Sequence, residues 1–179
     1  MVFINSSHLL ASTYNTVNEV NMETLQEQTY AGLDDYKGKA VYTGHRTRDV
    51  RFSSGYGITF DGNHTIYLSL KYAHAVLAID TESDEVKVEV KSSSLYPHKI
   101  YFDATMNSLL ITMYDTTCAR NNIGKWNLVN KEISLLLPCT FFNSSITVFG
   151  FELQNLWRTD LVHVDGSVWM VGQYYTDIR

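Results

Sequence analysis

The sequence predicts an all-β fold, a β-propeller of four-stranded antiparallel meanders, and three observations carry this prediction. One short pattern occurs four times in 179 residues: an apolar stretch, an Asp or Asn, turn residues, then a second apolar stretch with a tyrosine just beyond. Repetition of a unit of this length is typical of propeller blades. Aromatic residues make up 13% of the chain and include 12 tyrosines, which favours strands. Only 2 prolines occur, so the turns depend on Gly, Asn, Asp and Ser.

The spacing of the four repeats bounds the number of blades. A small residue ends the second apolar stretch of each repeat: Ser12, Ser69, Thr112 and Gly172. The interval from Ser69 to Thr112 matches a blade of roughly 40 to 50 residues, and the other two intervals are longer by about 15 residues. We therefore expect a single domain, 1–179, of about three and a half blades. The expected blades span approximately 1–31, 56–91, 98–138 and 160–179, with insertions at 32–55 and 139–159.

Four strands can be recognised within the second repeat. They are expected at Ile58–Asp61, Thr65–Leu70, Ala75–Asp80 and Val86–Val90. The last of them alternates apolar and charged residues, as in an edge strand with one side in water. An Asp or Asn follows the first strand of every repeat, which indicates a side chain that caps its own turn rather than a calcium ligand. These capping residues are Asn5, Asp61, Asp103 and Asp165.

The second repeat also carries a family resemblance. Gly57–Asn63, Ile66–Ser69 and Val76–Asp80 together resemble a blade of the NHL-repeat propellers, and they are similar to blades of the gluconolactonase and strictosidine-synthase-like propellers. The resemblance extends over three full repeats and half of a fourth. It implies a ring of the six-bladed type, of which this chain would form a part. The rest of the ring, or a second copy of the chain, would then be needed for closure.

Composition and short motifs narrow the possible partners and compartments. The net charge of −5 offers no basic stripe to nucleic acid, and no apolar run reaches the roughly 18 residues of a membrane span. Glycosylation triplets begin at Asn5, Asn63 and Asn143, which slightly favours an extracellular chain and leaves the compartment open. Cys118 and Cys139 are expected at one end of the third blade. A disulfide between them is sterically reasonable, and two free buried thiols are the alternative.

One end of the blades is expected to gather the candidate binding residues. In an antiparallel meander the loops after the second and fourth strands leave the sheet at the same end. The insertions and the repeated tyrosines follow those strands, and binding residues commonly lie on such loops. The alternative is that each tyrosine packs against the neighbouring blade with its hydroxyl bonded to backbone. The candidates are Tyr14, Tyr72, Tyr114 and Tyr174 on the loops, and Tyr56, His98, Asp160 and Arg158 beside the central channel.

No motif in the sequence specifies catalysis. There is no glycine-rich phosphate loop, no paired-cysteine zinc spacing and no nucleophile elbow. We therefore expect a non-catalytic module that binds a protein or glycan partner and needs no cofactor. The resemblance to gluconolactonases implies an alternative, a metal-dependent lactonase or esterase with a divalent metal such as calcium in the channel. Of Tyr56, His98 and Asp160, however, only Asp160 is a hard oxygen ligand. A purely structural extracellular repeat is the third possibility.

Overall fold

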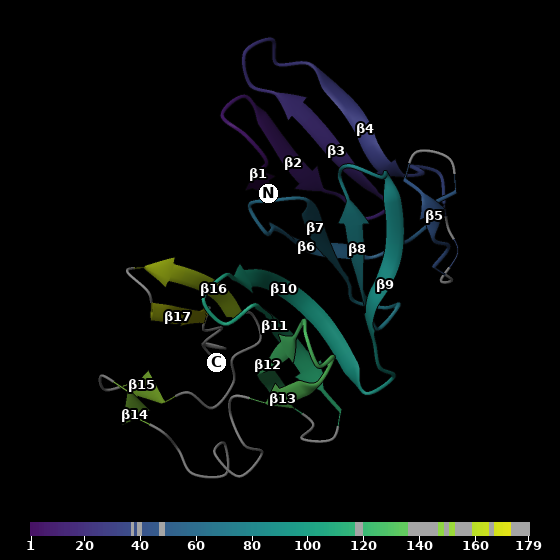
Figure 1. Ribbon diagram of the computed structural model, residues 1–179. Helices are drawn as coiled ribbons and strands as arrows, with labels where there is room; N and C mark the ends of the chain where they lie inside the picture. Colours follow the sequence, from purple (N-terminus) through teal and green to yellow (C-terminus); the bar gives the residue numbers. More distant parts are fainter. Residues whose placement is uncertain are drawn as a thin grey trace, which may run out of the picture.

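The computed structural model is all-β: the residues that it describes form strands, turns and loops, and no helix. Figure 1 shows the sheets following one another around a common centre, where the first strands of successive sheets contact each other. This arrangement confirms the predicted propeller blades. The structure describes residues 1–36, 38, 41–46, 49–116 and 120–135, together with the strand backbones of 147–148, 151–152, 159–164 and 167–172.

Each full blade is an antiparallel meander in chain order, as the repeats predicted. Blade one consists of β1 (Val2–Phe3), β2 (His8–Ser12), β3 (Thr16–Asn21) and β4 (Glu27–Gly32). Blade two consists of β6 (Gly55–Phe60), β7 (Thr65–Leu70), β8 (Ala75–Asp80) and β9 (Glu85–Lys91), with β5 (Gly44–His45) added beside β9. Blade three consists of β10 (Leu95–Asp103), β11 (Ser108–Asp115), β12 (Arg120–Asn127) and β13 (Ile133–Leu135). Two further pairs follow, β14 (Thr147–Val148) with β15 (Phe151–Glu152) and β16 (Thr159–Val164) with β17 (Ser167–Gly172).

Asp and Asn side chains cap the turns between first and second strands, as predicted. Asn5 Oδ1 accepts two backbone N–H groups at 2.8 and 2.9 Å, and Asp61 Oδ1 accepts two at the same distances. Asp103 Oδ1 accepts one at 3.0 Å. These oxygens are therefore engaged in local structure, which is the usual role of Asp and Asn in tight turns.

A second capping series lies between the third and fourth strands. Asn21, Asp80 and Asn127 each accept two backbone N–H groups of the following turn. The N–H groups of Ser83 and Glu82 stabilise the ionised form of Asp80 and lower the pKa of its carboxyl. Four positions after each cap, a residue adopts the left-handed φ that closes the hairpin. These residues are Leu25 (57°), Asp84 (59°) and Lys131 (59°).

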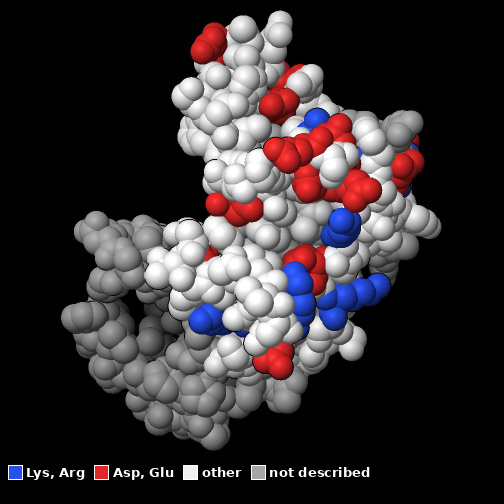
Figure 2. Space-filling model, viewed as in Figure 1, with Lys and Arg blue, Asp and Glu red and all other residues white. Residues whose placement is uncertain are grey.

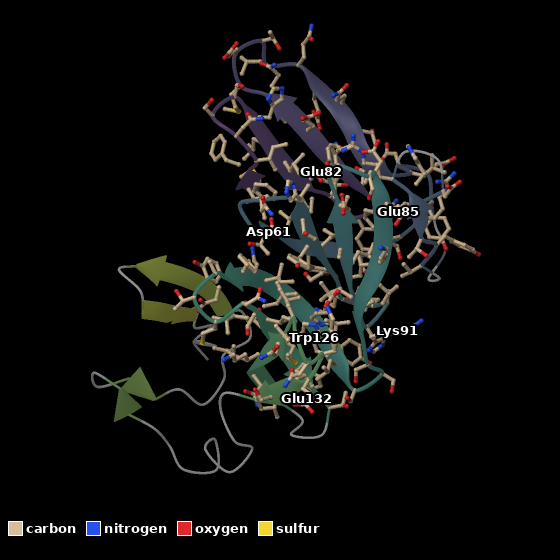
Figure 3. The ribbon with its side chains drawn as sticks, viewed as in Figure 1. Asp61, Glu82, Glu85, Lys91, Trp126 and Glu132 are labelled. Carbon is tan, nitrogen blue, oxygen red and sulfur yellow. The ribbon has the colours of Figure 1, made fainter. Side chains whose placement is uncertain are left out.

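The capped turns define the two ends of the blades. We call the end that carries them the turn end, and the end where the chain leaves the second and fourth strands the loop end. Figure 3 shows Asp61, Glu82 and Glu85 together at the turn end of blade two, and Lys91 at the opposite end of β9. The predicted meander is confirmed by this alternation of ends along the chain.

Apolar side chains fill the spaces between adjacent blades. One cluster joins blades one and two and includes Leu10, Leu68 and Phe52, all fully buried. A second cluster joins blades two and three and includes Tyr67 and Leu109. Strand β7 is buried on both faces because alternate residues point into the two clusters. Stacking of neighbouring blades is therefore the source of the core.

Because of a bulge in β9, this strand contributes buried residues to both apolar clusters. Val86 is buried with blade one, whereas Val90 is buried with blade three. Residues at even spacing normally share a face, and the register shift of β9 against β8, between Val76 and Leu77, reverses the second valine. The simple alternation that we predicted for this strand is therefore interrupted, and Val88 is left 40% exposed.

The described part of the insertion between blades one and two does not stay at the loop end, where we expected it. It follows the outer edge of blade two to the turn end, where β5 pairs with the start of β9 and the Arg46 N–H donates to the Asp84 carbonyl at 2.9 Å. It then returns through Val50 and Phe52, both fully buried between blades one and two. The apolar residues of the insertion therefore draw it into the core.

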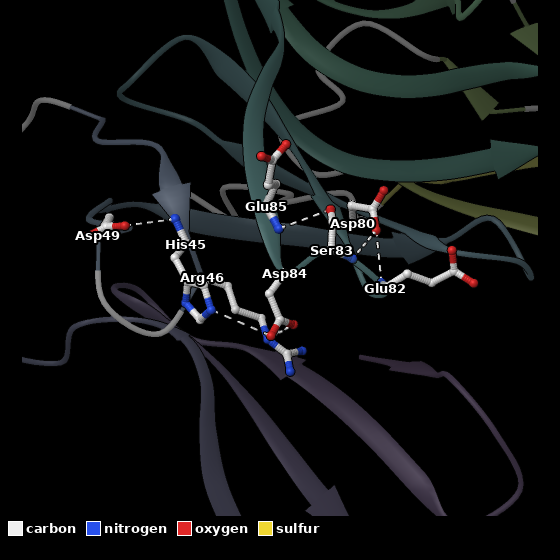
Figure 4. A network of polar contacts seen from close by, with 8 residues as sticks. All are labelled: His45, Arg46, Asp49, Asp80, Glu82, Ser83, Asp84 and Glu85. Carbon is white, nitrogen blue, oxygen red and sulfur yellow. Dashed lines mark hydrogen bonds and ion pairs between the residues drawn. The ribbon is translucent and has the colours of Figure 1, made fainter.

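Charged residues of the insertion join the two blades at the turn end (Figure 4). Arg46 Nε lies 2.7 Å from Asp84 Oδ1, in an ion pair rather than an aligned hydrogen bond. The Arg46 guanidinium also lies over the Tyr30 ring of blade one, 3.9 Å from its centre. Burial raises the pKa of the Tyr30 hydroxyl, and the Arg46 charge opposes that shift. These contacts connect the insertion to both blades, which gives the network a structural role.

Candidate functional site

Two bulges place the predicted channel residues at the loop end. The register of β6 shifts between Gly55 and Gly57, and the register of β10 shifts between Pro97 and Ile100. Tyr56 is the extra residue at the first shift, and His98 and Lys99 together lie opposite the single residue Thr112 at the second. A bulge turns its extra residue away from the regular pleat. Tyr56 and His98 thus leave the two first strands at equivalent positions in neighbouring blades.

The small residues that anchor each repeat hold these bulges. The Ser69 hydroxyl accepts the Gly57 N–H at 2.8 Å and donates to the His98 carbonyl of the next blade. In blade three the Thr112 hydroxyl accepts the Lys99 N–H at 2.9 Å. A hydroxyl at this position therefore has a structural purpose, which explains why Ser and Thr recur there.

Tyr56 and His98 meet across the boundary between blades two and three. Their ring centres are 4.6 Å apart, at an interplanar angle of 35°. This approach requires Gly57, because a Cβ there would lie 2.5 Å from the His98 carbonyl oxygen. The sequence analysis placed both residues beside the channel, and the structure brings their rings together.

A second aromatic contact joins the same two blades. His74, in the turn after β7, lies 4.2 Å from Tyr96 between ring centres, and its Nδ1 is 2.9 Å from the Leu95 carbonyl oxygen. Tyr96 in turn contacts Tyr114 edge-on, with ring centres 6.1 Å apart. We did not predict His74 or Tyr96. The alternation of Tyr96 with His98 just before a first strand could have indicated them.

Lys71 lies between two tyrosines in the turn after β7. Its Nζ is 5.2 Å from the centre of the Tyr56 ring and 5.5 Å from the centre of the Tyr72 ring, within cation–π range. The two rings meet edge-on, 6.4 Å apart. Sequence reasoning missed Lys71, although it directly precedes one of the predicted tyrosines.

Tyr14 and Tyr72 lie outside strands as predicted, whereas Tyr114 lies within β11, where it pairs with Tyr96 and Asn121; all three are open to solvent. Tyr14, Tyr72 and Tyr114 are 54%, 49% and 40% exposed, and their hydroxyls make no hydrogen bond to any other described residue. Among the described residues, therefore, no backbone group bonds these three hydroxyls. We call the set at the loop end the aromatic face. Its members are Tyr14, Tyr56, Lys71, Tyr72, His74, Tyr96, His98 and Tyr114.

The other predicted site residues are not part of the aromatic face or lie outside the described residues. Asp160 pairs with Val171 in the backbone ladder of β16 and β17. Asn5 and Asn63 are both exposed, in capped turns at the turn end. The remaining candidates lie outside the described residues: Tyr174, Arg158, Cys118, Cys139, Asn143 and the turn residue Asp165.

Acidic and basic side chains gather over different blades. Figure 2 shows acidic side chains gathered over blade one and the adjoining part of blade two, and basic side chains gathered where blades two and three meet. The turn end of blade two carries Asp61, Glu82, Asp84 and Glu85. Asp61 and Lys71 lie at opposite ends of β7.

Within the part of the chain that is described, no three His, Cys, Asp or Glu side chains come together as metal ligands. None of these residues forms a helix long and apolar enough to cross a membrane.

Comparisons with known proteins support the fold. No protein-family model matches the chain, and no curated protein matches it. A solved structure described as a nidogen/laminin complex is similar at a TM-score of 0.55 and 12% identity, over 75% of this chain and 46% of that chain. A structural-genomics protein of unknown function from Bacteroides thetaiotaomicron is similar at a TM-score of 0.45 and 13% identity, over 91% and 52%. This chain thus spans about half the length of each.

Proposed function

We propose that this chain is a non-catalytic β-propeller module that binds a protein or glycan partner through the aromatic face. One observation carries the proposal: exposed tyrosines at the loop end belong to two series of ring contacts, Tyr72–Tyr56–His98 and His74–Tyr96–Tyr114, and each series crosses from blade two to blade three. Tyrosine offers a large rigid surface with a polar tip, and such rings are enriched where proteins bind partners.

The form of the face suits a macromolecular partner better than a small molecule. Tyr14, Tyr72 and Tyr114 come from three different blades and stay exposed rather than closing over a cavity. Small ligands are usually taken into concave pockets, whereas protein partners are met by broader surfaces. The similar nidogen/laminin structure is itself a protein complex, which makes protein the first class of partner to test.

The proposal is tested with an array that carries both synthetic peptides and glycans. The probe is the labelled chain, compared with a Tyr72→Ala/Tyr114→Ala double variant and a Leu25→Ala/Val129→Ala double variant. Leu25 and Val129 are each 75% exposed at the turn end, so the second variant is a matched control. We expect the first variant to lose binding and the second to keep it. Equal binding by all three chains would contradict the proposal.

Calcium distinguishes the module from the lactonase alternative. A ligand that binds only the folded state raises the melting temperature in proportion to its affinity. We expect millimolar calcium to leave the melting temperature unchanged and the chain to hydrolyse no lactone. A calcium-dependent rise together with hydrolysis would replace the module by the metal-dependent enzyme. Absence of both effects and of all array binding would favour the structural repeat.

A further inference from the structure

We propose that the aromatic face recognises a carboxylate on an acidic peptide, and that Lys71, held between Tyr56 and Tyr72, is the residue that binds it. This inference rests on the proposed function and adds the chemistry of its partner. The observation behind it is a charged side chain that lies between two aromatic rings and has no counter-ion among the described residues.

In the described part of the chain, the contacts of the Lys71 ammonium are with aromatic rings. It lies 5.2 and 5.5 Å from the centres of the Tyr56 and Tyr72 rings. No Asp or Glu among the residues described lies within ion-pair distance of it, although the chain carries a net charge of −5. An ammonium that faces aromatic rings keeps its other donors free. These donors are available to an anion from outside.

The backbone fixes the turn that carries this lysine. Ser54 is fully buried and accepts the Lys71 N–H through its carbonyl oxygen and the Tyr72 N–H through its hydroxyl, each at 3.0 Å. Ser54 itself has a φ of +64°, a conformation that costs a residue with a side chain free energy. The position of Lys71 is therefore determined before any partner arrives, which lowers the entropic cost of binding.

The charge distribution of the molecule favours an acidic partner at this end. The acidic side chains Asp61, Glu82 and Glu85 lie at the turn end, away from the aromatic face. The acidic side chains described nearer the loop end, Asp34 and Asp35, are exposed and form no ion pair with Lys71. None of these described carboxylates neutralises Lys71, so its positive charge is left to attract an approaching carboxylate.

An acidic peptide fits the geometry better than an acidic sugar. A sugar ring stacks on an open aromatic face, and the Tyr56 ring already receives Lys71 and His98. A peptide instead needs the ammonium for its carboxylate and exposed apolar surface for neighbouring side chains, and Tyr72 and Tyr114 provide such surface.

Amide chemical shifts of the labelled full chain test the inference. The probes are acetyl-Gly-Tyr-Glu-Glu-Tyr-Gly-amide, the same peptide with Gln in place of Glu, and sialyllactose. We expect the Glu peptide to shift the amides of Lys71, Tyr72 and His98 and to bind about tenfold more tightly than the Gln peptide, which corresponds to one charged contact. The difference shrinks with added salt, because exposed charges are screened.

Variants assign the effect to Lys71. Lys71→Gln is expected to bind the Glu peptide about tenfold more weakly, whereas Lys71→Arg keeps the charge and most of the affinity. Lys87→Gln is the matched control, because Lys87 is exposed on β9 and pairs with Glu85 at 3.3 Å. Unchanged melting temperatures show that each variant is folded.

The opposite results are equally clear. The inference is overturned if Lys71→Gln binds the Glu peptide like the parent chain, if sialyllactose alone shifts the face, or if no probe shifts it. If array binding depends on Tyr72 and Tyr114 but not on Lys71, the proposed function is retained. Only the inference that Lys71 recognises a carboxylate is then rejected.

Discussion

At Gly57 the two blades that carry the aromatic face come so close that no side chain fits. A Cβ at this position would lie 2.5 Å from the His98 carbonyl oxygen and 2.9 Å from the Ile100 nitrogen, both of them backbone atoms. Backbone atoms cannot rotate out of the way as a side chain can. Gly57 therefore sets the separation of β6 from β10, and with it the distance between the Tyr56 and His98 rings.

Gly57→Ala is expected to destabilise the chain by about 3 kcal/mol, as overpacking of a tight contact does. Urea unfolding measures the change. Gly62→Ala is the matched control, because a Cβ there meets nothing within 4 Å and only the φ of 81° opposes it. We expect about 1 kcal/mol for that strain. Equal losses for the two variants would contradict the close approach.

Ionisation of Tyr67 is expected to destabilise the folded chain at alkaline pH. The residue is 6% exposed between blades two and three, and burial raises the pKa of its hydroxyl to about 12, with smaller contributions from the charges of Asp61 and Glu89. Below pH 10 the hydroxyl is protonated in both the folded and unfolded chains. Between pH 10 and pH 12 the unfolded chain ionises first, so the free energy of unfolding falls.

Tyr67→Phe is expected to reduce that alkaline loss. Two units of pKa correspond to about 2 to 3 kcal/mol, and the variant has no hydroxyl to ionise. The measurement is the free energy of unfolding at neutral pH and near pH 12 for both chains. Burial also raises the pKa values of Tyr30 and Tyr101, but these residues are common to both chains and cancel in the comparison. If the free energy of unfolding changes equally with pH in both chains, the pKa of Tyr67 is not raised by folding, which would contradict the prediction.

Among the elements, β9 connects blade two to both of its neighbours. Its bulge sends Val86 towards blade one and Val90 towards blade three. Glu89 also reaches blade three, where its Oε1 accepts the Trp126 indole N–H at 2.9 Å and lies 2.5 Å from Lys131 Nζ. Figure 3 shows Trp126 in blade three, on the side towards blade two. A single irregular strand thus holds three blades together.

A double-mutant cycle of Glu89→Ala and Trp126→Phe measures this tie between blades. We expect a coupling of about 1 kcal/mol, because a hydrogen bond to a partly buried carboxylate exceeds a neutral one. Glu85→Ala with Trp126→Phe is the control cycle, since Glu85 lies at the far end of β9 and pairs with Lys87. Additive effects in both cycles would mean that the Glu89 contact adds nothing to stability.

The elements could be predicted from the sequence because the repeats state them four times. β7 and β8 have the predicted bounds, and β9 extends the prediction by one residue at each end. The bulges at Tyr56, His98 and Glu89 could not be predicted, since a register shift is set by hydrogen bonds to neighbouring strands rather than by local pattern. For the same reason the sequence did not predict that Tyr56 and His98 contact each other, or that Lys71 and His74 lie beside them.

In the whole molecule, one face of blade one has no neighbouring blade in the described structure. Leu10 faces blade two and is fully buried, so Leu9 points the other way. Phe3 pairs with Leu9 and Leu9 pairs with Val20, which forms an apolar row across three strands. Phe3 is 57% exposed. The expected closure of the ring by a further blade would bury this row.

In a sample that holds only this chain, a second copy can supply that blade, as the sequence analysis proposed. We expect light scattering to give the mass of a dimer or a larger closed species, with or without calcium. Phe3→Glu/Val20→Glu places two charges in the apolar row and is expected to shift the mass to that of the monomer. The control is Leu25→Ala/Val129→Ala, which leaves the row intact. A parent chain that is already a stable monomer would contradict closure by a second copy.

Hydroxyl-radical footprinting tests the central claim, that partners bind at the loop end, most directly. The chain is labelled alone and with the strongest binder from the peptide and glycan array, and each residue is compared. The predicted result is protection of Tyr72 and Tyr114 with no change at Leu25 and Val129. Protection of the turn-end residues, with the tyrosines labelled as before, would show that partners bind elsewhere and would contradict the claim.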